Sequence, residues 1–145
     1  MKVNSTHSSA ALAALAFLAL FSFGACTAKD CIDPVGRWST REGQSIVFQK
    51  KGKALWLTRF GSKIDTTPMA FRYDCGSEPA TLDFFGFRAG SLVGKTLFGI
   101  VEWNSDTTFR YNADAGTNPY IRPTTFESEQ TMKFFLERNS QPTTE

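Results

Sequence analysis

Short apolar segments recur along the chain about every ten residues, and turn-forming residues separate them. None of these segments carries the long 3.6-residue stripe of an amphipathic helix. The pattern predicts an all-β fold, a single antiparallel up-and-down barrel of about eight strands. The expected strands are residues 36–40, 44–49, 54–60, 69–74, 80–87, 96–103, 107–112 and 131–138.

Two connections between these segments are short enough to be hairpin turns. Residues 49–53 join two apolar runs, and Gly52 can adopt the positive φ that a tight turn needs. Residues 104–106 are Asn, Ser and Asp, whose side chains hydrogen-bond turn backbone readily. Strands joined this closely must be antiparallel.

Alternation along the strands assigns side chains to faces. In the last segment Met132, Phe134, Leu136 and Arg138 share one face. Residues 96–103 are apolar on both faces, which predicts a central or covered strand.

The chain begins with a pattern typical of export rather than of a folded domain. Lys2 precedes an uncharged apolar run at 10–23, too short for a stable transmembrane span, and small residues follow it. We therefore expect a signal peptide at 1–25, a lipidated tether at 26–35, the β-barrel domain at 36–138 and a disordered polar tail at 139–145.

The tetrapeptide Phe23-Gly24-Ala25-Cys26 resembles the lipobox of bacterial lipoproteins, with Phe23 where that pattern usually has Leu. The resemblance implies that Cys26 is acylated and anchors the protein to a membrane of the cell envelope. Thr27 after the cysteine resembles the signal that sorts some lipoproteins to the outer membrane, facing the periplasm. An alternative cut after Ala28 would release a soluble periplasmic protein.

Two further cysteines, Cys31 and Cys75, remain after Cys26. In an oxidising compartment two leftover thiols most simply form a disulfide, although two separate buried thiols stay possible. The chain-entropy treatment credits a bridge over so long a loop with about 4 kcal/mol.

The first and last strands carry residues that resemble the calycin group, the lipocalin-like barrels. In that group a Gly-x-Trp motif, here Gly36-Arg37-Trp38, opens the first strand, and an arginine, here Arg138, closes the last. The resemblance implies that Trp38 packs across one end of the barrel and that the Arg138 guanidinium stacks on its indole as a plug.

The second half of the chain also resembles a bacterial domain of unknown function that is common in secreted proteins. The order of residues that carries this resemblance is Gly99, Ile100, Asp106, Thr107, Tyr111, Gly116, Arg122, Pro123, Phe126 and 136–138.

Charge and residue chemistry exclude several function classes. Removing Lys2 with the signal leaves 15 Lys and Arg against 14 acids, which is not the basic footprint of a nucleic-acid-binding protein. The single histidine, His7, lies in the predicted signal, so the mature domain lacks the usual base of hydrolases and the commonest metal ligand. We therefore expect no enzyme, no metal and no cofactor.

Two sets of charged residues are candidate sites. Lys50, Lys51, Lys53, Arg59 and Lys63 are predicted to gather near one hairpin, where they either face anionic lipid or glycan or keep the hairpin soluble. The acids Asp65, Asp74, Glu78 and Asp83 are interpreted as solvated turn residues.

These observations predict a membrane-anchored binding module for a small apolar ligand or a macromolecule. The aromatic residues Trp56, Phe98, Trp103, Phe109 and Phe134 either line a ligand cavity or fill the barrel. Segments 88–95 and 113–123 are expected to form much of the rim. The alternative is a periplasmic inhibitor or immunity protein that blocks an enzyme by surface contact.

Overall fold

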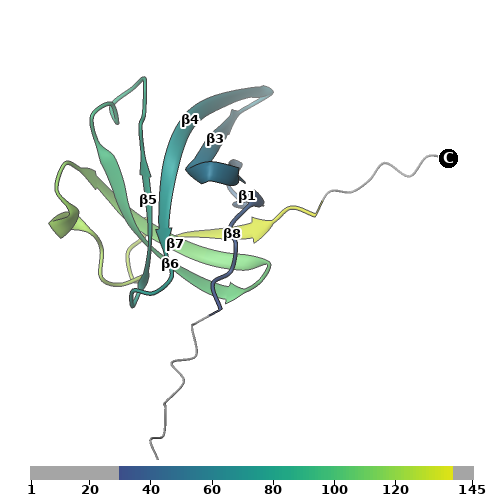
Figure 1. Cartoon of the computed structure of the whole chain (residues 1–145). Helices are drawn as coiled ribbons and strands as arrows, with labels where there is room; N and C mark the ends of the chain where they lie inside the picture. Colours follow the sequence, from purple (N-terminus) through teal and green to yellow (C-terminus); the bar gives the residue numbers. More distant parts are fainter. Residues whose placement is uncertain (1–29, 139–145) are drawn as a thin grey trace, which may run out of the picture.

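Residues 30–138 of the chain are described by a computed structural model. Eight strands form a closed barrel in sequence order, and β8 returns to pair with β1 (Figure 1). The strands are β1 (Gly36–Ser39), β2 (Gln44–Gln49), β3 (Lys53–Phe60), β4 (Lys63–Asp74), β5 (Ala80–Phe85), β6 (Thr96–Ser105), β7 (Thr108–Gly116) and β8 (Met132–Leu136). The predicted all-β fold, with eight antiparallel strands, is confirmed.

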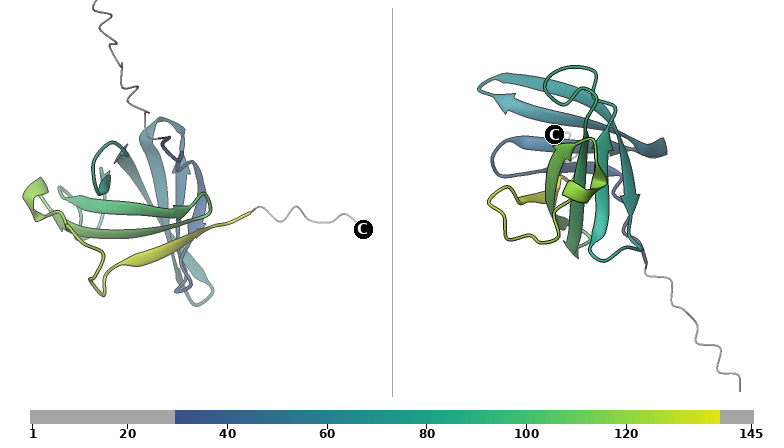
Figure 2. Two further views of the ribbon diagram at one scale, coloured as in Figure 1. Left: turned by 90° about the horizontal axis from the view of Figure 1, so that it is seen from below. Right: turned by 90° about the vertical axis from the view of Figure 1, so that its left-hand side faces the viewer.

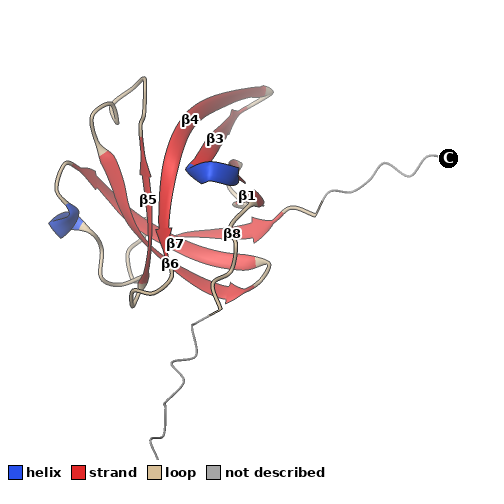
Figure 3. Cartoon of the chain, viewed as in Figure 1, coloured by secondary structure: helices blue, strands red, loops and turns tan. Residues whose placement is uncertain are grey.

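The helical content of the described chain is two 3₁₀ turns, η1 (Lys50–Gly52) and η2 (Pro119–Ile121), drawn in blue in Figure 3. Within residues 30–138 no helix has the length and apolar character needed to cross a membrane.

Strand β4 is longer than the sequence pattern predicts. It begins at Lys63 rather than at residue 69, because its first half pairs with β3 from Phe60 with Lys63 to Leu55 with Pro68. Most side chains of this half are exposed. A polar, exposed strand lacks the apolar alternation by which a strand is predicted from sequence, so it is recognised only by its pairing with a partner strand.

Because consecutive strands run in opposite directions, the connections fall into two groups, one at each end of the barrel. We call the end with the connections β1–β2, β3–β4, β5–β6 and β7–β8 the loop end. The opposite end is the terminal end, because β1 starts and β8 finishes there, beside η1 and the short β6–β7 turn.

The barrel interior is filled by aromatic rings. Trp38, Phe48, Phe84, Phe109 and Phe134 are each at most 2% exposed. Phe109 and Phe134 stack at a centroid separation of 4.9 Å, and Trp38 meets Phe109 edge-on at 5.0 Å. Rings in such contacts leave no continuous cavity along the barrel axis.

A second apolar layer lies on the outside of the barrel. Phe98 and Ile100 of β6 are 7% and 1% exposed, while Val101 on the opposite face is 1% exposed and belongs to the inner core. The long connection of residues 117–131 covers this outer surface. Strand β6 is therefore covered on both sides, as its sequence predicts.

Candidate functional site

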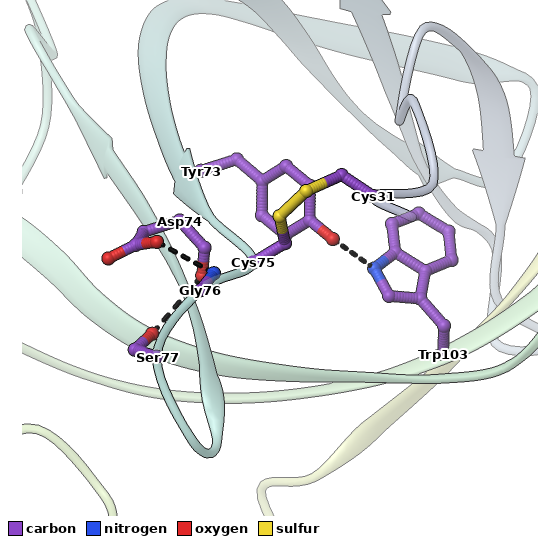
Figure 4. Close-up of a disulfide and its surroundings, with 7 residues drawn as sticks. All are labelled: Cys31, Tyr73, Asp74, Cys75, Gly76, Ser77 and Trp103. Atoms are coloured by element: carbon purple, nitrogen blue, oxygen red, sulfur yellow. Dashed lines mark hydrogen bonds between the residues drawn. A yellow bond between two sulfur atoms is a disulfide. The ribbon is translucent and has the colours of Figure 1, made fainter. Parts of the chain in front are cut away.

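The terminal end of the barrel is closed by the N-terminal segment. The Trp38 indole Nε1–H donates to the Pro34 carbonyl oxygen at 2.8 Å. The predicted disulfide between Cys31 and Cys75 is present and ties this segment to the β4–β5 connection (Figure 4). Beside it the Trp103 indole N–H donates to the Tyr73 hydroxyl at 2.8 Å.

Two of the three residues assigned to the barrel plug lie at this end. Trp38 is 1% exposed, and a Cβ on Gly36 would come within 3.2 Å of Leu136 Cδ1. The predicted stacking of Arg138 on Trp38 is wrong. Arg138 is exposed beyond the end of β8, and the rings that face Trp38 are Trp103 and Phe109. Because other aromatic rings pack around the buried Trp38 indole, no face of the indole is left for the Arg138 guanidinium.

The predicted cavity-lining residues occupy three different environments. Phe109 and Phe134 are fully buried in the inner core, and Trp103 packs at its edge. Phe98 is on the outer face, with the Arg122 guanidinium 5.6 Å from its ring centroid, so its assignment to the interior is wrong. Phe98 and Trp103 are an odd number of positions apart on β6, which places them on opposite faces.

Two of the predicted residues border open space: Trp103 lines a hollow of about 480 Å³ at the terminal end, beside Tyr73 and the disulfide, and Trp56 lines a smaller one. Trp56 lies at the loop end, where its indole N–H donates to Gln44 Oε1 at 3.0 Å. A pocket of about 210 Å³ separates Trp56, Thr58 and Thr67 from residues of the β5–β6 connection, Phe87 and Leu92.

Exposed large apolar side chains lie on three separate connections around the loop end. Tyr120 is 93% exposed, Phe60 63% and Val93 53%, and Ile64 and Ile121 lie beside the first two. These five residues, which we call the apolar rim, come from the β3–β4, β5–β6 and β7–β8 connections and their strand ends. Val35, the remaining exposed large apolar residue described, lies near the terminal end.

A buried ion pair holds the β7–β8 connection in place. Asp83 on β5 is 3% exposed, and its carboxylate accepts from the Arg122 guanidinium at 2.5 and 3.0 Å. It also accepts from Arg72 and from the Gly99 backbone N–H. The interpretation of Asp83 as a solvated turn acid is therefore wrong.

Two further contacts fix the same connection. Asn112 Nδ2–H donates to the Thr125 carbonyl at 3.0 Å, and the Arg110 guanidinium lies 4.3 Å from the Phe126 ring centroid. At its apex the Asn118 side chain accepts from the Tyr120 backbone N–H at 3.0 Å. Tyr120 is thus carried on an anchored turn, which lowers the entropy lost on binding.

The sequence pattern did not identify these anchors as site residues. Arg122 and Asn112 lie in polar or mixed segments, where their burial leaves no local signal. The position of Asp83 between the apolar Leu82 and Phe84 is compatible with either face of a covered strand.

The cations predicted to gather at one hairpin are divided between the two ends. Lys50 and Lys51 are in η1 and Lys53 begins β3 at the terminal end, whereas Arg59 and Lys63 flank the β3–β4 turn at the loop end. Strand β3 runs between the two groups, so they form no single patch.

Two tyrosines have perturbed ionisation. Burial raises the pKa of Tyr111 well above its ordinary value, and its hydroxyl has no hydrogen-bond partner among residues 30–138. Burial also raises the pKa of Tyr73, against the hydrogen bond from Trp103.

The described residues hold no group of three or more acidic or cysteine side chains that could bind a metal ion. Cys26, the predicted lipid acceptor, and the predicted signal peptide and tail lie outside the described residues. Comparison of the chain with protein-family models, with curated proteins and with solved structures found no match.

Proposed function

We propose that this protein is a lipid-anchored, non-catalytic binding module of the bacterial envelope whose apolar rim contacts a macromolecular partner. The observation that carries the proposal is the 93% exposure of Tyr120 on an anchored connection of a barrel whose interior is filled, with Phe60 and Val93 exposed on two other connections of the same end. Exposed aromatic residues surrounded by polar ones are typical of protein-binding surfaces.

The rigid support of Tyr120 is what a binding residue needs and an incidental exposed side chain does not. The Arg122–Asp83 pair and the Asn112–Thr125 hydrogen bond fix the connection that carries Tyr120. A partner that binds this surface need not order it first. An inhibitor or immunity protein that blocks an enzyme by surface contact is one form of this function.

A small apolar ligand is the second candidate. The pocket beside Trp56, Phe87 and Leu92 supports it, with apolar walls and two threonine hydroxyls. Its volume of about 210 Å³ is below the roughly 300–1,000 Å³ of ordinary ligand sites. The hollow beside Trp103 is larger, about 480 Å³, but Asp30, Glu78 and Glu102 are in its lining, which does not suit an apolar ligand. We therefore place macromolecular binding first.

The test is co-purification from envelope extract with the full chain in detergent, using a rim variant that combines Phe60→Ser and Tyr120→Ser. The matched control is Val35→Ser, which removes an exposed apolar residue at the other end. We expect a protein that is retained by the wild type and by the control and is lost with the rim variant. Equal retention by all three forms, or retention of a small molecule only, would contradict the proposal.

A further inference from the structure

Strand β8 is paired with β7 along most of its length but with β1 only at its end. The β7–β8 register runs from Thr108 with Phe135 to Tyr111 with Met132. Within residues 30–138 the β1–β8 register holds two pairs, the last being Ser39 with Phe135. The first half of β8 therefore has one edge that no described strand covers; β8 can be followed in yellow in Figure 2.

The edge is uncovered because β1 turns away early. The Thr40 backbone N–H donates to the Gln44 carbonyl at 2.8 Å, which closes the β1–β2 turn. Without this turn, β1 would continue beside β8 and pair Thr40 with Phe134 and Arg41 with Lys133.

The ladders show which backbone groups of β8 face this edge. The Leu136 N–H donates toward β7, to the Thr107 carbonyl, and the Glu137 N–H donates toward β1, to the Arg37 carbonyl. Since backbone groups alternate along a strand, the N–H and C=O of Lys133 point away from β7. Lys133 is two residues from Phe135, which belongs to the last β1–β8 pair.

These groups face a hollow of about 490 Å³ in the barrel wall. Arg41, Glu42 and Gln44 form one side of the hollow, and Met132 and Lys133 are on the other. Its charged side chains have both signs, so the lining favours neither a strong anion nor a strong cation. The backbone N–H and C=O of Lys133 are therefore the groups that would determine what binds in the hollow.

We infer that this hollow is a strand-acceptor site, in which an extended peptide segment of a protein partner lies antiparallel to β8. A residue opposite Lys133 would form two main-chain hydrogen bonds with it, as in other complexes that add a strand to an exposed sheet edge. The peptide occupies the place that a continued β1 would take. The inference is independent of the apolar rim.

The main-chain chemistry allows a matched pair of variants. Lys133→Pro removes the edge-facing N–H and leaves the β7–β8 hydrogen bonds of Met132 and Phe134 in place, since proline is tolerated at sheet edges. Lys133→Ala removes the same side chain and keeps the N–H.

The probe is a library of random 12-residue peptides displayed on phage and selected against the full chain in detergent, followed by synthesis of the selected peptides. We expect binding to weaken about tenfold or more with Lys133→Pro and to change less than about threefold with Lys133→Ala. Recovery of no peptide, or equal binding to both variants, would overturn the inference.

Hydrogen exchange on the wild type gives a readout that requires no variant to fold. Peptide binding should slow exchange of the Lys133 amide, and unchanged exchange at that amide would count against the site. A dimer that Lys133→Pro abolishes would instead assign the edge to a second copy of the chain. The rim variant should bind the peptides normally, which separates this test from that of the proposed function.

Discussion

The aromatic ring of Tyr111 lies against the Cα of Gly99 inside the barrel. A Cβ at residue 99 would overlap the Tyr111 ring and come within 2.5 Å of the Leu82 carbonyl oxygen. The absent side chain therefore provides the space that the ring occupies over β6.

Gly99→Ala should destabilise the domain by about 1–3 kcal/mol, the usual cost of overpacking a core. Urea denaturation followed by tryptophan fluorescence measures the change. Gly99 does not require a positive φ, so the effect is steric. Combining Gly99→Ala with Tyr111→Ala should cost less than the sum of the two single changes, and strict additivity would argue against the contact.

Tyr111→Phe should leave the stability at pH 7 unchanged or raise it by about 1 kcal/mol, because it removes a buried hydroxyl that has no partner. Denaturant titration provides the measurement. A loss of stability above about 1 kcal/mol would mean that the hydroxyl is hydrogen-bonded in solution.

The same variant makes a prediction for alkaline pH. The folded-state pKa of Tyr111 is raised above its ordinary value of 10.0, so the unfolded chain gives up this proton first. The contribution of Tyr111 is fully present below pH 10.0 and is lost as pH rises above that value toward the folded-state pKa. The wild type should therefore lose stability more steeply than Tyr111→Phe above pH 10.0, and parallel curves would refute the assignment.

Arg122→Ala should cost about 2–4 kcal/mol, because it leaves the Asp83 carboxylate buried without its main partner. Arg72→Ala is the matched control. The Arg72 side chain is 67% exposed, and exposed ion pairs contribute less than about 1 kcal/mol. Thermal and urea unfolding compare the two variants, and equal losses would show that Arg122 does not anchor the connection.

Replacing Cys31 and Cys75 together by serine should lower the free energy of unfolding by about 4 kcal/mol, from release of a 44-residue loop. Unfolding under oxidising and reducing conditions measures it. Reduction should destabilise the wild type and leave the double variant unchanged. An effect of reduction on the double variant would assign it to another thiol.

Cys26→Ser should move the protein from the membrane fraction to the soluble fraction, because it removes the predicted acylation site. Cell fractionation and intact-mass analysis provide the measurement. A protein that stays in the membrane fraction, or a wild-type mass without acyl chains, would contradict lipid anchoring.

The local pattern of apolar and polar residues was sufficient to locate a strand where that strand has one apolar face. The approximate positions of the eight strands, apart from the first half of β4, and both tight turns follow from alternation and turn residues, and β2 begins and ends where the pattern places it. The Cys31–Cys75 disulfide and the burial of Trp38 were also predictable, the first from cysteine count and compartment and the second from the resemblance.

The local pattern did not predict the environment of a residue whose partner lies elsewhere in the chain. The exposed half of β4 is a strand because it pairs with β3. Asp83 can be buried because Arg122, 39 residues later in the chain, donates hydrogen bonds to its carboxylate. Alternation placed Arg138 on the face of Leu136, but β8 ends at Leu136, opposite Trp38, and Arg138 lies exposed beyond the strand.

The sequence by itself determined the strand order, the antiparallel pairing and the absence of histidine from the expected mature domain, because periodicity, turn length and composition are local properties. Only the tertiary structure decided that Phe98 faces outward, that the interior is filled with rings, and that β1 leaves part of β8 uncovered. These features depend on how eight strands close and which long connection covers them, and no single segment contains that information.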